Sequence, residues 1–216
     1  LSNKDRSEIY RNKNKTLAKL HSVDYEKIGL EDYGKPGSYV ARQVSRWSKQ
    51  YRASETDDIE AMNNLIDWLP KNIPDDDETS IVHGDYRLDN MILKNNKVIG
   101  ILDWELSTLG HPIADFSYHC LSWRTQEAFW DQAKLKELGV PSEKEYMDMY
   151  CENTGKDLSK NWEFYMAFNM FKIAGILQGI LGRVRDGTAS SKHAEDRGMM
   201  VYPLSKAAWD TIKENF

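Results

Sequence analysis

The segment from His83 to Asn90, HGDYRLDN, carries side chains suited to phosphoryl transfer. Asp85 could orient an attacking hydroxyl group and accept its proton. Asn90 and the later Asp103 offer oxygen ligands of the kind that Mg²⁺ prefers. Arg87 adds a cation that could steady the transferring group. These residue types and their spacing indicate a metal-assisted phosphotransferase site.

A predicted β-hairpin follows this loop directly. The runs 91–94 and 98–102 are rich in β-forming residues. Between them, the adjacent Asn95 and Asn96 tolerate the left-handed backbone that a two-residue turn demands. The hairpin is therefore the element that must position the site.

The expected hairpin register also predicts which side chains share a face. A two-residue turn pairs Lys94 with Lys97 and places Asn90 opposite Ile101. Asp103, two residues further along, would then project from the same face as Asn90, about 7 to 8 Å away at Cα. The two oxygen ligands should converge on one cation, on the condition that no bulge breaks the register.

Helical periodicity predicts the elements that precede the strands. Apolar spacing predicts helices over 5–21, 38–53 and 57–69, the last of which stops at Pro70. The acidic run 75–78 is interpreted as a solvated loop. The chain is thus expected to be α+β and mostly helical, with a small β-hairpin that carries the active site.

The apolar stretch 164–181 passes for a membrane helix by length and composition. It contains Gly175 and Gly179 at a spacing used by paired membrane helices, but Lys172 lies near its middle. We expect a helix buried in a globular core, and no membrane partner.

The overall composition narrows the class of protein. The 216 residues carry a net charge of -5 and lack the broad basic field that tracks a nucleic acid backbone, so no nucleic acid partner is expected. The first residues contain no apolar signal segment, and Cys120 and Cys151 have no disulfide or metal spacing. We expect a cytoplasmic protein whose residues 1–216 form one domain.

Four basic residues gather on one side of the predicted helix 38–53, at Arg42, Arg46, Lys49 and Arg52. They are either a solvated helix face or a cradle for a phosphorylated or carboxylated acceptor, such as the CoA part of a hydroxyacyl thioester. The segment 183–198 has two interpretations as well, a mobile acceptor loop or a disordered connection.

The motifs resemble a known family. His83-x-Asp85-x-x-x-x-Asn90 resembles the catalytic loop of protein kinases, and Asp103-Trp104-Glu105 stands where they carry Asp-Phe-Gly. The glycine after His83 and the later sequence GHPIAD look like the aminoglycoside phosphotransferase and choline kinase group. HGDYRLDN followed by LDWELSTLGHPIAD is similar to kinase-like domains related to those fused to some acyl-CoA dehydrogenases.

The resemblance implies the C-terminal lobe of a protein-kinase-like fold and a role for each site residue. It implies that Asp85 is the catalytic base and that Asn90 and Asp103 hold Mg²⁺. It implies that His83 and Asp115 support the site by fixing the loop. It also implies that Arg87 contacts phosphate. Glu105 stays open between a group beside the metal and a salt-bridge partner.

The motifs that grip a nucleotide are not found in the sequence. It contains no GxGxxG loop, no Walker GxxxxGK and no VAIK-like lysine. Members of the resembled family carry this apparatus in an N-terminal β lobe, so we expect that lobe to be absent here. The fragment alone is expected to be inactive.

Three classes of function remain open from the sequence. The leading hypothesis is an enzyme that moves the γ-phosphoryl group of ATP to a hydroxyl of a small molecule, such as a hydroxyacyl thioester or an aminoglycoside-like alcohol. The alternative is a catalytically silent pseudokinase or interaction module. A metal-dependent hydrolase that uses His83 and Asp85 would need further ligands at defined spacing.

Overall fold

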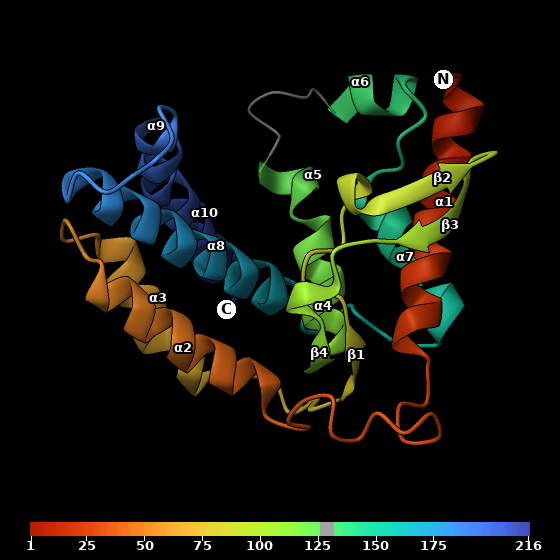
Figure 1. Ribbon diagram of the computed structural model, residues 1–216, viewed down its shortest axis with the longest axis horizontal. Helices are drawn as coiled ribbons and strands as arrows, with labels where there is room; N and C mark the ends of the chain where they lie inside the picture. The colour runs from red at the N-terminus through yellow and green to blue at the C-terminus, as the bar shows by residue number, and fades with distance from the viewer. Residues whose placement is uncertain (126–131) are drawn as a thin grey trace. The chain divides into compact units, whose positions relative to one another are not determined.

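The computed structural model describes residues 1–125 and 132–216 (Figure 1). Its contacts divide the chain into two compact units. Unit 1 combines residues 1–37 with 78–160, and unit 2 combines residues 38–77 with 161–216. The predicted catalytic loop belongs to unit 1, and the predicted basic helix face belongs to unit 2.

Unit 1 begins with helix α1, Asn3–His21, which confirms the predicted helix over 5–21. Ser2 and Asp5 form a capping box, which satisfies backbone N–H groups that the first turn leaves open. The helix buries Ile9 and Leu17 on one side. In Figure 1 it runs beside the β2–β3 hairpin of the same unit.

Four short strands make two separate antiparallel pairs in the described part of unit 1. Strand β1, Ser80–Val82, pairs with β4, Thr108–Gly110, and strand β2, Met91–Lys94, pairs with β3, Lys97–Ile101. The second pair is the predicted hairpin, and its turn residues have positive φ angles as expected. The pairing of β1 with β4 was not predicted, because it joins segments 26 or more residues apart.

The predicted register holds for the two pairs next to the turn, the second being Leu93 with Val98, and is wrong from Ile92 onward. Lys94 does pair with Lys97, but a bulge shifts the ladder so that Met91 pairs with Ile101. The backbone N–H of Leu102 donates to the carbonyl of Asn90 at 2.9 Å, so Asn90 lies opposite Leu102 instead of Ile101. One extra residue in β3 causes the shift, as expected for a β-bulge.

The remaining elements of unit 1 surround the strands. Helix α4 begins with Pro112 at a position that suits proline and is buried along almost its whole length. Its Phe116 stacks on Tyr150 with ring centroids 3.9 Å apart. The other elements are η2 Leu88–Asn90, η3 Trp104–Leu106, α4 Pro112–Cys120, α5 Ser122–Thr125, α6 Gln132–Glu137 and α7 Glu143–Thr154.

The regular elements of unit 2, in its described residues, are all helices joined by loops. It contains α2 Tyr39–Ala53, α3 Glu60–Trp68, η1 Leu69–Lys71, α8 Trp162–Arg185, α9 Ala194–Met199 and α10 Val201–Asn215. The helix predicted over 57–69 is α3, which begins at Glu60 and ends at Trp68. Pro70 lies in the 3₁₀ turn η1 that follows it. The end of α8 and helix α9 occupy much of the segment 183–198, so that segment is not simply a loop.

Helix α8 is a core helix of unit 2. It is long and apolar enough to cross a membrane, but 72% of its most apolar window is buried inside the protein. A Cβ on Gly175 would lie 3.6 Å from the carbonyl oxygen of Trp47, and one on Gly182 would lie 3.3 Å from that of Ser54. The glycines of this helix therefore let α2 and the residues after it pack closely against α8.

The acidic run 75–78 is more than the solvated loop that was expected. In unit 2, Asp76 accepts a hydrogen bond from the Tyr165 hydroxyl at 2.6 Å, and Asp77 accepts bonds from the backbone N–H of Ser38. In unit 1, Glu78 forms an ion pair with Lys156. Contacts made only after folding give this run its structure, so its composition alone did not reveal them.

Candidate active site

The backbone at the start of the catalytic loop requires glycine at position 84. Gly84 has φ 84°, in the region that residues with a Cβ rarely adopt. A Cβ there would also lie 2.7 Å from the carbonyl oxygen of Leu106. The glycine therefore lets the loop pass close to η3.

His83 is completely buried and fixes the loop from within. Its Nε2 donates to the carbonyl of Leu102 at 2.9 Å, and its Nδ1 accepts from the backbone N–H of Asp85 at 3.2 Å. One nitrogen thus donates while the other accepts, which is the pattern of a neutral imidazole. The ring also lies 5.0 Å from the ring of Trp104. His83 connects the loop to the end of the hairpin.

Asp115 supports the loop from helix α4. Its Oδ2 accepts from the backbone N–H of His83 and its Oδ1 from that of Gly84, both at 2.9 Å. His21 lies 3.1 Å from the same carboxylate and accepts a hydrogen bond from the Tyr150 hydroxyl through its other nitrogen. The sequence spacing of His21 gives no sign of this role. The structure places it in the buried network under the loop.

The pKa of Asp115 reflects these donors. Burial by itself raises the pKa of this carboxyl, but hydrogen bonds from His21 and from two backbone N–H groups oppose that effect and hold the pKa below its usual value. The carboxylate is therefore the form that fits this buried position.

Asp85 is held by the side chain of Asn90. The Asn90 Nδ2 donates to the backbone carbonyl of Asp85 at 2.9 Å and to its Oδ2 at 3.0 Å. Tyr118, from α4, also forms a hydrogen bond with Asp85, and burial followed by the charge of Asp85 raises the pKa of Tyr118 to about 12. Sequence reasoning missed Tyr118. Its position three residues after Asp115 places both on one face of a helix, which is a signal that could have found it.

His119 extends the same face of α4. Its Nδ1 donates to the backbone carbonyl of Tyr86 at 2.7 Å, and its Nε2 accepts from the Tyr146 hydroxyl at 3.0 Å. Burial, together with the nearby ammonium of Lys13, holds the pKa of His119 well below its usual value. His119 therefore stays neutral and serves the loop as a structural support.

The remaining predicted residues of the loop lie toward solvent. The Arg87 guanidinium lies 3.8 Å from the carboxylate of Asp85 and 3.4 Å from that of Asp89, with 60% of its side chain exposed. Asp103 and Glu105 are exposed as well. Asp103 has φ 64° and ψ 59°, a left-handed backbone that is uncommon for a residue other than glycine.

The donor set fits a Mg²⁺ ion. The Nδ2 of Asn90 donates its hydrogen bonds to Asp85, so the Oδ1 of Asn90 remains available as a metal ligand. Among residues 1–125 and 132–216, no group donates a hydrogen bond to that oxygen or to the carboxylate of Asp103. An amide oxygen and a carboxylate are hard ligands that suit Mg²⁺, with water and phosphate oxygens in the other positions.

No cluster of three or more His, Cys, Asp or Glu side chains able to hold a metal occurs in the part of the chain that the structure describes. The expected pair of Asn90 and Asp103 is not such a cluster. Because Leu102 donates to Asn90 and directly precedes Asp103, the bulged hairpin still brings the two residues to the same end of the hairpin. The shared face that an unbroken register predicted for Asn90 and Asp103 does not follow from this bulged register, so their convergence on one cation stays a prediction.

The four predicted acceptor-binding residues lie together on α2, in unit 2. Arg46 lies over the ring of Trp47, and Arg52 pairs with Glu55 at 3.1 Å. Lys49 is exposed, and Arg42 is half-buried. The structure thus confirms that they share one helix and leaves their function as a prediction.

The chain is similar in sequence to a known enzyme family and to several larger proteins. Residues 1–150 match the phosphotransferase enzyme family, APH. The chain is 45% identical over 219 residues to acyl-CoA dehydrogenase family member 10 of Mus musculus, with 98% of this chain covered but 20% of that protein. The chain therefore spans less than a third of the length of the curated relatives it matches.

Solved structures show the same relationship. A putative aminoglycoside phosphotransferase from Ralstonia eutropha is 49% identical, with a TM-score of 0.94 over 100% of this chain and 68% of that one. Choline kinase from Cryptosporidium parvum shares 13% identity and a TM-score of 0.62 over 97% of this chain and 68% of that one. The second likeness shows a shared kinase-like fold.

Proposed function

We propose, on the premise that this chain belongs to the phosphotransferase enzyme family, that it carries the catalytic loop of an ATP- and Mg²⁺-dependent kinase acting on a small-molecule alcohol. The observation that carries the proposal is the carboxylate of Asp85, held by the amide of Asn90 in a loop that Asp115 braces. A fixed carboxylate beside a metal-binding pair is what phosphoryl transfer to a hydroxyl needs.

In this proposal Asp85 acts on the acceptor. Its carboxylate orients the acceptor hydroxyl and takes its proton as the oxygen attacks the γ-phosphorus, and the bond from that phosphorus to the bridging oxygen of ADP breaks. Asn90 and Tyr118 keep the carboxylate in place through their hydrogen bonds. Arg87, close to Asp85 and exposed, would contact the charge of the phosphoryl group.

The metal would be held by Asn90 and Asp103. A bound Mg²⁺ ion would neutralise charge on the phosphate oxygens. The left-handed backbone of Asp103 is consistent with this role, because strained residues gather at functional sites. Glu105, the second residue after Asp103, would assist from beside the metal or serve as a salt-bridge partner.

The acceptor is proposed as a class. The relatives are named as acyl-CoA dehydrogenase family members and as a putative aminoglycoside phosphotransferase. These names favour a hydroxyacyl thioester or an aminoglycoside-like alcohol as the acceptor. Both offer the hydroxyl that Asp85 would activate.

The nucleotide clamp is proposed to lie outside this chain. This chain covers 68% of the solved aminoglycoside phosphotransferase relative, so that relative has further residues with no counterpart in this chain. We therefore take the protein that performs the reaction to be the full-length one, with residues 1–216 as its C-terminal lobe and a cytoplasmic site of action.

The alternative proposal is a catalytically silent module with the same fold. The presence of Asp85, Asn90 and Asp103 disfavours it, because each supplies a group that the reaction uses. A direct assay separates the two.

The test is ADP release by the full-length protein with ATP, Mg²⁺ and a library of alcohols. We expect Asp85→Asn to lower kcat by about 10² to 10⁴-fold, because a general base contributes that much. Asp103→Ala should abolish the Mg²⁺-dependent rise in melting temperature that ATP produces in the wild type.

Asp148→Asn is the matched control, because Asp148 is an exposed carboxylate whose ion pair, with Lys144, lies within α7. It should keep wild-type kcat. If no alcohol is phosphorylated, and ATP stabilises the wild type and Asp103→Ala equally, the silent alternative is correct.

A further inference from the structure

Asn96 is a turn residue of the β2–β3 hairpin for which the proposed reaction gives no role. Its backbone has φ 60°, a left-handed conformation that asparagine tolerates. Its Nδ2 donates to the Oδ1 of Asp5 at 2.7 Å and to the Oε2 of Glu8 at 3.2 Å, and both of these acceptors belong to helix α1. The side chain of Asn96 therefore binds the tip of the hairpin to α1.

The acceptor with the shorter bond is an ionised carboxylate. Hydrogen bonds from the side chains of Ser2 and then of Asn96 lower the pKa of Asp5 to about 2, so Asp5 is charged at neutral pH. A hydrogen bond to an ionised acceptor is stronger than one between neutral groups. Asp5 is itself held by Ser2 in the capping box at the start of α1. The tip of the hairpin is thus tied to a part of the helix that is already fixed.

The catalytic loop is bound to the same helix at a second point. The hydroxyl of Tyr86 donates to the backbone carbonyl of Lys13 at 2.9 Å, and Tyr86 is 1% exposed. Asn90 lies between Tyr86 and Asn96 in the sequence. On α1 the two anchor points are separated by about 8 to 12 Å of helix, at about 1.5 Å per residue. The segment 86–96, which carries Asn90, is therefore attached to α1 at both of its ends.

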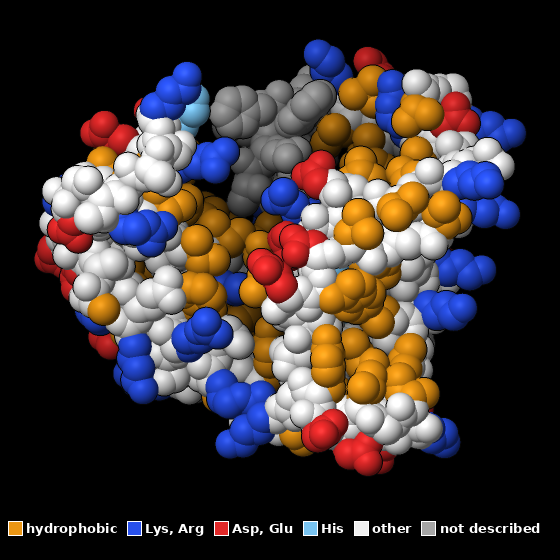
Figure 2. Space-filling view, viewed as in Figure 1, with side chains coloured by type: hydrophobic (Ala, Val, Ile, Leu, Met, Phe, Trp, Pro, Cys, Tyr) orange, Lys and Arg blue, Asp and Glu red, His pale blue; other side chains and the backbone are white. Residues whose placement is uncertain are grey.

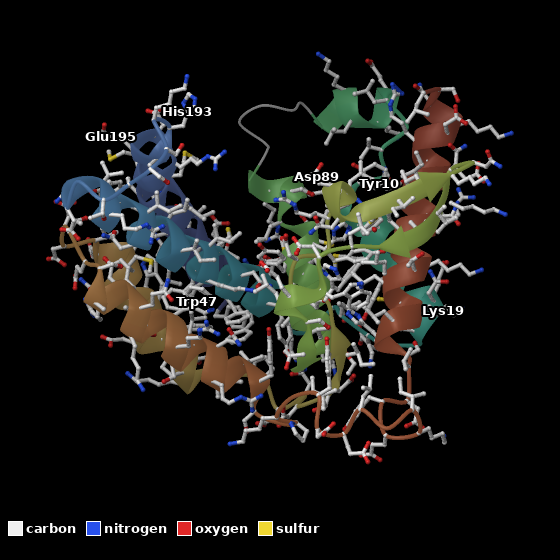
Figure 3. The ribbon with its side chains drawn as sticks, viewed as in Figure 1. Tyr10, Lys19, Trp47, Asp89, His193 and Glu195 are labelled. Atoms are coloured by element: carbon white, nitrogen blue, oxygen red, sulfur yellow. The ribbon has the colours of Figure 1, made fainter. Side chains whose placement is uncertain are left out.

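Helix α1 is a firm base for these anchors. Its Tyr10 packs edge-on against Trp123 and Tyr146, with ring centroids 5.8 Å and 6.0 Å apart. Figure 3 shows Tyr10 on the side of α1 that faces the rest of unit 1. The aromatic packing holds the helix between its two anchor points.

The strands of the hairpin connect the tip to the candidate metal ligands. At the open end, the backbone N–H of Leu102 donates to the carbonyl of Asn90 at 2.9 Å, and Asp103 follows directly. A hairpin of two strands is only marginally stable by itself in water, so it depends on the element against which it packs. Releasing the tip from α1 should therefore loosen the bond between Leu102 and Asn90 as well.

We propose that Asn96 is a positioning residue for the Mg²⁺ ligands: by binding the tip of the hairpin to α1, it fixes the second end of the segment that carries Asn90 and so sets the positions of Asn90 and Asp103. For its Mg²⁺ part the inference rests on the proposed function. Its structural part, the order of the open end of the hairpin, is independent of any reaction.

The experiment compares Asn96→Gly and Asn96→Asp with the wild type in the full-length protein. Glycine keeps the left-handed backbone and removes the amide. Residue-resolved hydrogen exchange should show the Leu102 amide exchanging about three- to tenfold faster. The Mg²⁺ concentration that half-saturates the ATP-dependent rise in melting temperature should increase by about the same factor, because the ligands are less well held.

Asn96→Asp sharpens the test. Aspartate also tolerates the left-handed backbone, but it places a third carboxylate against Asp5 and Glu8. Like charges repel, so both effects should be larger than in Asn96→Gly and should shrink at high salt. A turn residue that served only to shape the backbone would show no such difference between the two variants.

The same substitutions at Asn95 are the matched controls. Asn95 has φ 50° in the same turn and is exposed, and its side chain forms no hydrogen bond with residues 1–125 or 132–216. Asn95→Gly and Asn95→Asp should leave the exchange of the Leu102 amide and the Mg²⁺ dependence unchanged.

Unchanged exchange of the Leu102 amide in both Asn96 variants would overturn the proposal, and so would equal effects of the Asn95 variants. An unchanged Mg²⁺ half-saturation in Asn96→Asp would overturn it too. Faster exchange in the Asn96 variants alone, in a protein whose wild type phosphorylates no alcohol, would support the positioning of the hairpin and refute the proposed function instead.

Discussion

At the scale of single residues, Asp115 joins three parts of unit 1 through two carboxylate oxygens. It accepts hydrogen bonds from the loop at His83 and Gly84, contacts His21 of α1, and is itself anchored in α4. An isolated buried carboxylate would be strongly unfavourable, and these donors offset that cost. One charged group therefore connects the catalytic loop to both α1 and α4.

We predict that Asp115→Asn destabilises the fold by about 1 to 3 kcal/mol at pH 7, because an amide nitrogen would face a backbone N–H that then has no acceptor. The folded pKa of Asp115 lies below its usual 3.8, so its stabilising contribution is present above about pH 4 and is lost as the pH falls through the lowered value. Urea unfolding at pH 7 and at acidic pH measures both effects. A variant as stable as Asp148→Asn at pH 7 would contradict the prediction.

At the scale of elements, α4 and the hairpin position the site from two sides. Helix α4 presents Asp115, Tyr118 and His119 at helical spacing toward the loop. Asn90 directly precedes β2, and Asp103 follows β3, so the antiparallel hairpin brings both residues to its open end. Figure 2 shows apolar side chains exposed over this hairpin, and the exposed residues include Ile92, Ile99 and Leu102.

The turn of the hairpin gives a prediction at this scale. Asn95 is exposed and has φ 50°, so Asn95→Gly should keep or slightly increase stability, whereas Asn95→Val should cost about 1 to 2 kcal/mol. Thermal unfolding measures the difference. Lys97→Val, an exposed strand position in the same hairpin, is the control for adding a β-branched residue and should be nearly neutral. Equal losses at both positions would refute the turn argument.

At the scale of the whole molecule, the two units divide the predicted tasks. Unit 1 contains the loop, the hairpin and their supports, and unit 2 contains the basic face of α2. The proposed reaction assigns phosphoryl transfer to unit 1. The proposed acceptor-binding residues belong to unit 2, so acceptor affinity and catalysis should be separable by mutation.

We predict that the double reversal Arg46→Glu and Lys49→Glu raises the KM of an anionic acceptor by tenfold or more and leaves the KM of ATP unchanged, because the cations would contact only the acceptor. Steady-state kinetics of the full-length protein measures both constants. Lys15→Glu with Lys19→Glu, on α1, changes the net charge equally and should affect neither. An unchanged acceptor KM would leave the face as an ordinary solvated helix side.

The sequence by itself determined the elements whose signals are local. The helix over 5–21, the hairpin with its Asn95-Asn96 turn and the motif that identifies the family are each encoded within a few residues by spacing and backbone preference. The apolar pattern of α8 also predicted a core helix correctly.

Only the tertiary structure decided the contacts between distant segments. The bulge moved Asn90 from Ile101 to Leu102, because ladder geometry depends on how the strand packs as well as on the turn. His21 joined the site through Asp115, 94 residues away, and Lys13 came to lie under the loop. Local sequence fixes periodicity, but the partner of a buried polar group is known only after the chain has folded around it.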